Sequence, residues 1–261
     1  MIWPTVIAPM LLTVAVWWGS TAVIARLIVG NPARYPLLLR LFATIGATGF
    51  AVILALREVN STASAVAALL AALAVWSWIE VTFLTGKVTG LTARSPAQAV
   101  TSRQGFARHA FLALAAILWH ELLIVATIVI VAIGTHDSSN NLALQVLLLL
   151  WLMRSSAKLN LFLGVRNLGE GFFPPHLQHL LSFMRQRRMN PLMPVSLLLA
   201  GAISAYFCTA ALTASSTHEV AAATIIATLA ALALLEHLLM ILPVPAETLW
   251  RWSLANRRSS P

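Results

Sequence analysis

Seven apolar stretches, each about as long as the hydrocarbon core of a bilayer, constrain this chain more than any other feature. A membrane core of roughly 30 Å requires about 20 consecutive, mainly apolar residues in a helix. The segments between the stretches contain the Gly, Pro, Asn and Ser residues that end helices. We therefore predict an all-α, polytopic transmembrane helical bundle of about seven spans, with residues 1–261 forming a single membrane domain. The spans are predicted at 4–26, 36–56, 64–86, 109–134, 141–164, 193–214 and 220–242.

The composition agrees with this class and excludes others. Charged residues make up 10% of the chain and apolar residues 59%, whereas about a quarter of the residues in soluble domains are charged. A single cysteine, Cys208, excludes a disulfide or a cysteine metal cage within one chain. The sequence contains no Gly-rich phosphate loop, nucleophile elbow or HExxH array, so it favours a role other than that of an enzyme.

The positions of the basic residues predict an orientation. If the N-terminus is periplasmic, the outer connections carry only Arg57. Short cytoplasmic loops collect Lys and Arg, so we predict a periplasmic N-terminus, a cytoplasmic C-terminus and two long cytoplasmic loops, 87–108 and 165–192. The net charge of +9 then requires no nucleic-acid partner. The inner connections would carry Arg26, Arg34, Lys87, Arg94, Arg103, Arg108, Arg166, Arg185, Arg187, Arg188, Arg251, Arg257 and Arg258.

The second long loop contains an amphipathic piece, HLQHLLSFMRQRR, directly after Pro174 and Pro175. Proline is pre-organised for the first turn of a helix, and the apolar face and basic end that follow suit a helix in the lipid headgroup layer. A solvated basic turn before Pro191 is the alternative. The residues of this loop predicted to contact lipid or a partner are Glu170, His176, His179, Arg185, Arg187 and Arg188; we expect the two histidines to be surface polar groups rather than metal ligands.

Ionisable residues inside the predicted spans are candidates for function, because charges at membrane depth are costly. At 1.5 Å per residue, Glu80, Lys158 and Glu236 lie about 10–12 Å from the inner ends of their spans, whereas Glu121 and Arg154 lie about 18–20 Å deep. The predicted buried polar network comprises Glu80, His120, Glu121, Arg154, Lys158, Asn160, Glu236 and His237.

One interpretation of this network is structural. Arg154 and Lys158 are four residues apart and share one face of their helix. Buried ion pairs to carboxylates at matching depth would then hold the spans in register, with Lys158 expected to meet Glu80 or Glu236.

A second interpretation is a metal centre. Glu and His residues from several helices of a bundle can hold a pair of iron ions, and the candidates are Glu80, His120, Glu121, Glu236 and His237. Two observations weigh against it. The His and Glu residues are adjacent rather than three apart, and two nearby cations would repel a dication.

A third interpretation is a tetrapyrrole site. His120 or His237 would be the axial ligand of bacteriochlorophyll or a precursor, and Trp76, Trp78 and Trp119 would wall a flat pigment. Ordinary aromatic packing and a path for protons or a solute remain as further alternatives. No cofactor follows with certainty from the residues alone.

Several segments carry a resemblance to a known family. They are the opening IWPTVIAP with WWGSTAVI, FLTGKVTG after Glu80, HELLI at His120, and KLNLFLGVRNLGEGFFPPHLQHLLSFMRQRRMNPLMPVS in the second long loop. Together they resemble the PuhE family of purple bacteria, over most of the chain. Glu170 lies between Gly169 and Gly171 here, so the loop lacks an acidic pair.

The resemblance implies a multi-pass protein of the bacterial inner, intracytoplasmic membrane. It implies a gene near that of the reaction-centre H subunit and a role in assembling the photosynthetic reaction-centre and light-harvesting complex and in bacteriochlorophyll levels. The implied partners are reaction-centre or antenna subunits and membrane lipid. The family brings no catalytic residues to carry over. A membrane-embedded, metal-dependent oxidase of pigment biosynthesis and a non-catalytic tetrapyrrole carrier remain the alternatives.

Overall fold

The computed structural model describes residues 2–89 and 105–244, and this part of the chain is helical, with seven long helices and no strand. They are α1 (Ala8–Val29, preceded by the π-helical turn Trp3–Ile7), α2 (Tyr35–Ala55), α3 (Thr62–Leu84), α4 (Phe106–Gly134), α5 (Leu142–Leu163), α6 (Leu192–Thr213) and α7 (Thr217–Ile241). All seven are long and apolar enough to cross a membrane. The prediction of an all-α bundle is confirmed for the described residues, and its seven long helices have the length and apolar character predicted for spans.

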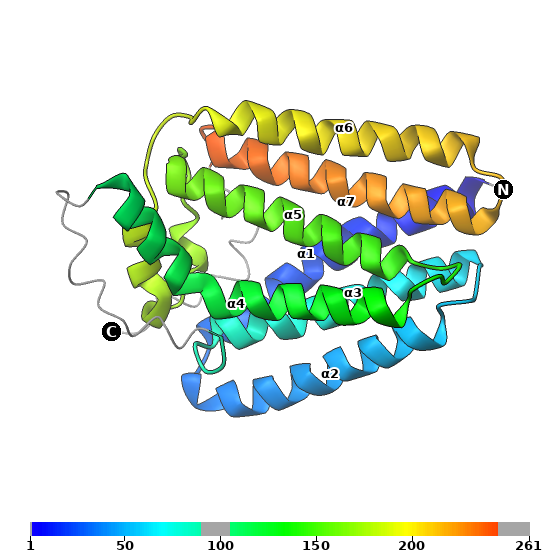
Figure 1. Cartoon of the computed structure of the whole chain (residues 1–261), viewed down its shortest axis with the longest axis horizontal. Coiled ribbons are helices and arrows are strands. Elements are labelled where there is room, and N and C mark those ends of the chain that lie inside the picture. Colours follow the sequence, from blue (N-terminus) through cyan, green and yellow to red (C-terminus); the bar gives the residue numbers. More distant parts are fainter. Residues whose placement is uncertain (1, 90–104, 245–261) are drawn as a thin grey trace.

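The helices run alternately up and down along one axis, and three short links, α2–α3, α4–α5 and α6–α7, lie at the end where the chain begins (Figure 1). The long loop between α5 and α6 lies at the opposite end, where α7 also ends. The described basic residues follow the same division: Arg26, Lys87 and Arg108 lie at or near helix ends on the side of the long loop, whereas Arg57 follows α2 on the side of the short links. Arg94, Arg103, Arg251, Arg257 and Arg258 lie outside the described residues.

Local sequence explains where the helices begin and end. The first span was predicted to end near Arg26, but α1 continues to Val29 and stops before Gly30, Asn31 and Pro32. A long basic side chain can remain in a helix and extend toward the membrane surface, so residues that break the helix set its end. Capping boxes fix the start of α3 at Ser61 and the start of α7 at Ser216.

Helices α3 and α7 are the most buried of the seven, and α2 and α6 lie at opposite edges of the bundle (Figure 1). The core is built largely from alanines of α3 and α7 together with larger aliphatic residues of α4 and α5. Small residues let membrane helices approach closely. A Cβ at Gly49 of α2 would lie 2.6 Å from the carbonyl oxygen of Ala71 in α3, which shows how near the two backbones come.

The long loop packs on the bundle in a way that differs from the prediction. The amphipathic piece forms a 3-10 segment, Pro175–Phe183, whose Leu177 and Leu180 are buried against Ala116 of α4. A short backbone pairing of Val165 with Arg185 and Arg187 holds the end of the loop to α5. The predicted helix is therefore a 3-10 segment, and its two buried leucines face protein rather than lipid.

Candidate functional site

A cavity of about 470 Å³ lies in the half of the bundle next to the long loop. Its walls come from α1, α3, α4, α5 and α7, and residues Asn167–Gly169, Phe173, Leu180, Phe183 and Met184 of the loop line it as well. Most of the lining is aliphatic or aromatic. Ionisable side chains on the wall are Glu80, His120, Arg154, Lys158 and Glu236. A largely apolar cavity with a few polar groups is the usual form of a small-molecule site.

Arg154 and Glu80 form an ion pair on this wall. The Nη2 atom of Arg154 in α5 lies 3.2 Å from Oε2 of Glu80 in α3, and it donates a hydrogen bond to that oxygen. The carboxylate is 9% exposed, whereas 48% of the Arg154 side-chain surface is exposed. Since Arg154 lines the cavity, its guanidinium is available to a molecule inside it.

Lys158 pairs with a carboxylate other than the two predicted. Its Nζ atom lies 2.5 Å from Oε1 of Glu121 in α4, and Oε2 of the same carboxylate accepts a hydrogen bond from the indole of Trp151. The expected partners, Glu80 and Glu236, form no ion pair with Lys158 in the described part of the chain. Glu236 instead accepts a hydrogen bond from Trp17 of α1.

The depth estimate explains this error. Counting from Arg108 assumed that α4 enters the membrane there and runs parallel to α5. In the structure α4 has 29 residues, and its first turns run obliquely to the rest of the helix (Figure 1). His109 in those turns stacks on Phe162 near the end of α5 and contacts Phe183 of the loop. Glu121 therefore lies less deep than its distance along the chain suggests, and the long Lys158 side chain reaches it.

His120 is almost completely buried beside the Arg154–Glu80 pair. It is 1% exposed, its Nε2 atom lies 3.9 Å from Oε1 of Glu80, and its ring packs on that of Phe83 at a centroid distance of 4.6 Å. Among the described residues, neither Nδ1 of His120 nor Oε1 of Glu80 has a hydrogen-bond partner. Unsatisfied buried polar atoms are rare and costly, so they mark this wall as a place where a ligand or solvent atom is expected.

His237 has a different role from His120. Its Nδ1 atom donates to the carbonyl oxygen of Ala233 at 2.8 Å, and its Nε2 atom lies 3.0 Å from the hydroxyl of Ser156 in α5. That hydroxyl bonds Ser196 of α6, which in turn accepts from Asn160. Both nitrogens are thus used within a buried polar chain that links α5, α6 and α7, and His237 is not available as an axial ligand.

The three candidate tryptophans do not form one wall. Trp76 is buried and lines the cavity. Trp78 packs at the α2–α3 contact, where a Cβ added at Gly46 would lie 2.9 Å from its Cβ atom. Trp119 is 56% exposed on the outside of α4. The prediction that all three surround one pigment is therefore wrong, because neighbouring positions on a helix point to different sides.

The candidate metal ligands are not gathered either. Within residues 2–89 and 105–244, no group of three or more His, Cys, Asp or Glu side chains is arranged to hold a metal ion. Glu80 and His120 lie together, whereas Glu121 is taken up by Lys158 and Trp151 and His237 by Ser156 and Ala233.

The candidate loop residues are spread over the cavity end of the molecule. His176 lies 2.9 Å from the carbonyl oxygen of Leu84 at the end of α3, and Nδ1 of His179 donates to the carbonyl oxygen of His176. The guanidinium of Arg185 lies over the rings of Phe106 and Phe162. Arg187 and Arg188 are exposed, and Glu170 begins a short 3-10 turn. These contacts attach the loop to α3, α4 and α5 beside the cavity.

Comparison with known proteins places the chain in a family. A family model described as "Protein of unknown function (DUF3623)" matches residues 4–260. The chain belongs to this DUF3623 family. It is also 32% identical over 261 residues to a protein of Rhodobacter capsulatus named "Uncharacterized 30.4 kDa protein in puhA 5'region", covering 94% of this chain and 90% of that protein. No solved structure matches the chain.

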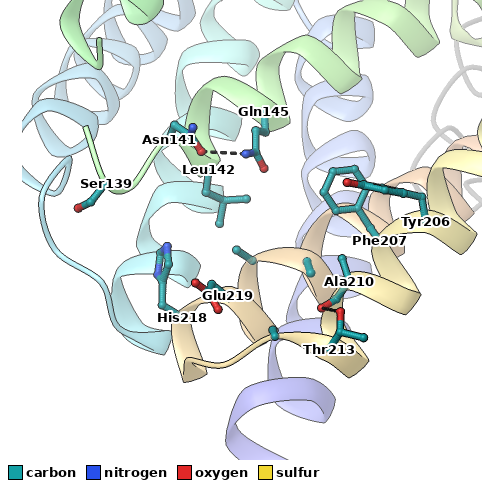
Figure 2. A pocket seen from close by; sticks show the side chains of 13 residues that line it. Ser139, Asn141, Leu142, Gln145, Tyr206, Phe207, Ala210, Thr213, His218 and Glu219 are labelled. Atoms are coloured by element: carbon teal, nitrogen blue, oxygen red, sulfur yellow. Dashed lines mark hydrogen bonds between the residues drawn. The ribbon is translucent and has the colours of Figure 1, made fainter. Parts of the chain in front are cut away.

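A second, smaller hollow in this DUF3623 protein lies at the end with the short links (Figure 2). It measures about 340 Å³ and is bordered by Tyr206, His218 and Glu219. Its polar groups serve local structure: Glu219 accepts from the backbone N–H groups of Ser215 and Ser216, and His218 bonds the carbonyl oxygen of Ser61. These contacts cap helices, so the cavity near the loop is the better candidate site.

Sequence reasoning missed several residues that shape the cavity end. Asn167 donates to the carbonyl oxygens of Leu239 and Leu242 at the end of α7, and Asn190 donates to those of Asn160 and Gly164 at the end of α5. Last-turn carbonyls of a helix need such donors. The one available signal was an Asn on each side of the loop, close to helix ends.

Proposed function

We propose that this protein is an integral membrane factor that assists assembly of a bacterial photosynthetic reaction-centre and light-harvesting complex, by handling bacteriochlorophyll or a related tetrapyrrole in its intramembrane cavity. The observation that carries the proposal is the cavity itself, which is mainly apolar and has His120, Arg154 and Glu80 on one wall. The name of the Rhodobacter capsulatus relative, which refers to the puhA 5' region, supports a link to photosynthesis. The resemblance to the PuhE family also supports a link to photosynthesis.

The position of the cavity suits a molecule that arrives from the lipid. All walls except the loop are helices long enough to cross a membrane, so an apolar ligand would remain at membrane depth. The loop would then be the part nearest a partner subunit on the same side of the membrane. We propose that this side is cytoplasmic, because it carries most of the basic residues. Reporter fusions after Arg57 and after Arg188 test the orientation, and activity of a cytoplasmic reporter at Arg57 would reverse it.

Deletion of the gene in a photosynthetic host tests the function. We expect a lower amount of assembled reaction-centre and antenna complex, measured by absorption of membranes and by immunoblot, with restoration by the wild-type chain. Ala157 in α5 lines the cavity, so Ala157→Phe should fill it and fail to restore the complex. Ala202→Phe is the matched control, because Ala202 is exposed on α6. Equal complex levels with and without the gene would reject the assembly role.

Purified protein tests the handling of pigment directly. We expect a chlorin-type absorption band after mild solubilisation, and a weaker band in the Ala157→Phe variant at equal protein yield. Metal analysis of the same sample distinguishes pigment handling from the alternative of a metal-dependent oxidase. Stoichiometric iron that depends on Glu80 and His120 would contradict the assignment and favour an oxidase.

A further inference from the structure

The guanidinium of Arg154 has more hydrogen-bond donors than the protein uses. Within the described part of the chain its one hydrogen bond goes to Glu80, and about half of its side-chain surface remains exposed where it lines the cavity. A guanidinium presents several N–H groups in a fixed fork. A molecule in the cavity that carries an oxygen acceptor would therefore meet donors already in place.

An unused acceptor lies beside these donors. Oε1 of Glu80 is buried and has no hydrogen-bond partner among the described residues, while Oε2 of the same carboxylate holds Arg154. His120 approaches Oε1 only to 3.9 Å, which is longer than a hydrogen bond. A ligand that satisfies this wall must therefore offer an acceptor to Arg154 and a donor to Glu80 from one small head group.

The local charge narrows the choice of head group. Among the described residues Arg154 is paired with Glu80 and Lys158 with Glu121, while Glu236 also lines the cavity. A further ionised carboxylate or phosphate would lie beside the buried Glu80 carboxylate without a cation of its own, in a medium of low dielectric constant where repulsion between like charges is strong. A neutral group with both a donor and an acceptor avoids this cost.

We infer that the cavity binds amphiphiles through a protonated carboxylic acid. The acid O–H donates to Oε1 of Glu80, its carbonyl oxygen accepts from Arg154, and the apolar body lies along Trp76, Phe83 and Leu150. This names the ligand class for the cavity and rests on its proposed use for a tetrapyrrole. A chlorin with a free propionic acid and a fatty acid share this chemistry, whereas a pigment esterified at that position lacks the O–H group.

Binding to the purified full-length chain in detergent tests the inference with paired probes. The probes are pheophorbide a and its methyl ester, and palmitic acid and methyl palmitate, with quenching of tryptophan fluorescence or displacement of the chlorin as the readout. We expect at least one acid to bind about tenfold more tightly than its ester, because the ester leaves Glu80 without a donor. The pair that shows the preference identifies the source of the ligand. Equal binding of acid and ester in both pairs overturns the inference.

A variant locates the acid on Arg154. Arg154→Lys keeps a positive charge beside Glu80 but loses the fork of N–H donors. The affinity of this variant for the acid should therefore fall to about its affinity for the ester. Arg57→Lys, at the other end of the bundle, is the matched control and should retain the preference. Retention of the full preference in Arg154→Lys would overturn the inference. Should this variant fold poorly, the wild-type comparison of acid and ester still decides.

The gene deletion and the binding comparison together separate this inference from the proposed function. Loss of the photosynthetic complex on deletion, together with equal binding of acid and ester, would reject the carboxylic acid and leave the assembly role standing. Normal complex levels on deletion, together with a tenfold preference for the acid, would reject the assembly role and leave the chemistry of the cavity standing.

Discussion

Arg154 of α5 donates to Glu80 of α3 across a distance of 3.2 Å, with the carboxylate buried and the guanidinium facing the cavity. The pair therefore has two consequences at once. It joins two neighbouring helices of the bundle, and it supplies the most polar part of the cavity wall. Changes to either residue should affect stability and ligand binding together, so experiments must separate the two.

The first prediction concerns the stability of this pair. Arg154→Met leaves the Glu80 carboxylate buried without a counter-ion. Breaking a fully buried pair costs about 3–5 kcal/mol, and we expect less here because half of the Arg154 side chain is exposed. We expect a loss of folded yield and a lower thermal midpoint in detergent. Glu80→Gln in the same chain should restore most of the loss, because no buried charge then remains unpaired. Additive losses in the double variant would contradict the pairing.

The second prediction assigns Lys158 to Glu121. Lys158→Met should reduce folded yield, and Glu121→Gln in the same chain should recover it, because these two side chains form the observed ion pair. Glu236→Gln is the control and should bring no recovery, since Glu236 forms no ion pair with Lys158 in the described part of the chain. Both effects are read from size-exclusion profiles of solubilised protein. Rescue by Glu236→Gln instead would mean that Lys158 pairs with Glu236, as the estimated depths of the two residues predicted.

The span pattern could be predicted from sequence because membrane thickness sets the length of each apolar stretch. Helix ends were less accurate: the first span was predicted to end at residue 26, three residues before the end of α1. Arg26 remains within α1, and the helix ends at the Gly30, Asn31 and Pro32 that follow. The Gly, Asn and Pro residues of the connection therefore mark the end of the helix more closely than the length of a membrane-spanning window does.

The site could be predicted only in part, because sequence gives depth but not direction. Trp76 and Trp119 were treated as equivalent, yet one lines the cavity and the other lies on the outer surface. Likewise His120 and His237 were interchangeable in sequence, yet Nδ1 of His120 has no hydrogen-bond partner among the described residues, whereas both ring nitrogens of His237 have one. The rotation of each helix about its axis and the oblique start of α4 determine which of these side chains face the cavity, and neither can be obtained from depth alone.

The third prediction concerns pH and the long loop. Burial lowers the pKa of His179 below its ordinary value of about 6.5. The docked loop therefore binds a proton less readily than an undocked one, and its packing should weaken as pH falls through about 6.5 and be retained above that value. We expect faster proteolysis within residues 165–191 at pH 5.5 than at pH 7.5.

A variant makes the pH effect specific. His179→Asn can still donate from its side chain toward the carbonyl oxygen of His176, but it does not titrate in this range. Its rate of proteolysis should change less with pH than that of the wild type. An equal dependence on pH in both proteins would show that another group controls the loop.

The last prediction concerns the contact between α2 and α3. A Cβ added at Gly49 would lie 2.6 Å from the carbonyl oxygen of Ala71 and 2.9 Å from Cβ of Ala74, so Gly49→Ala must push the helices apart. We expect a loss of about 1–3 kcal/mol, measured by thermal unfolding in detergent. Gly19→Ala in α1 is a matched control, because a Cβ there meets nothing within 4 Å. Since alanine favours a helix over glycine by about 1 kcal/mol, the control should be neutral or stabilising. Equal midpoints for the two variants would mean that α2 does not lie against α3 at this glycine.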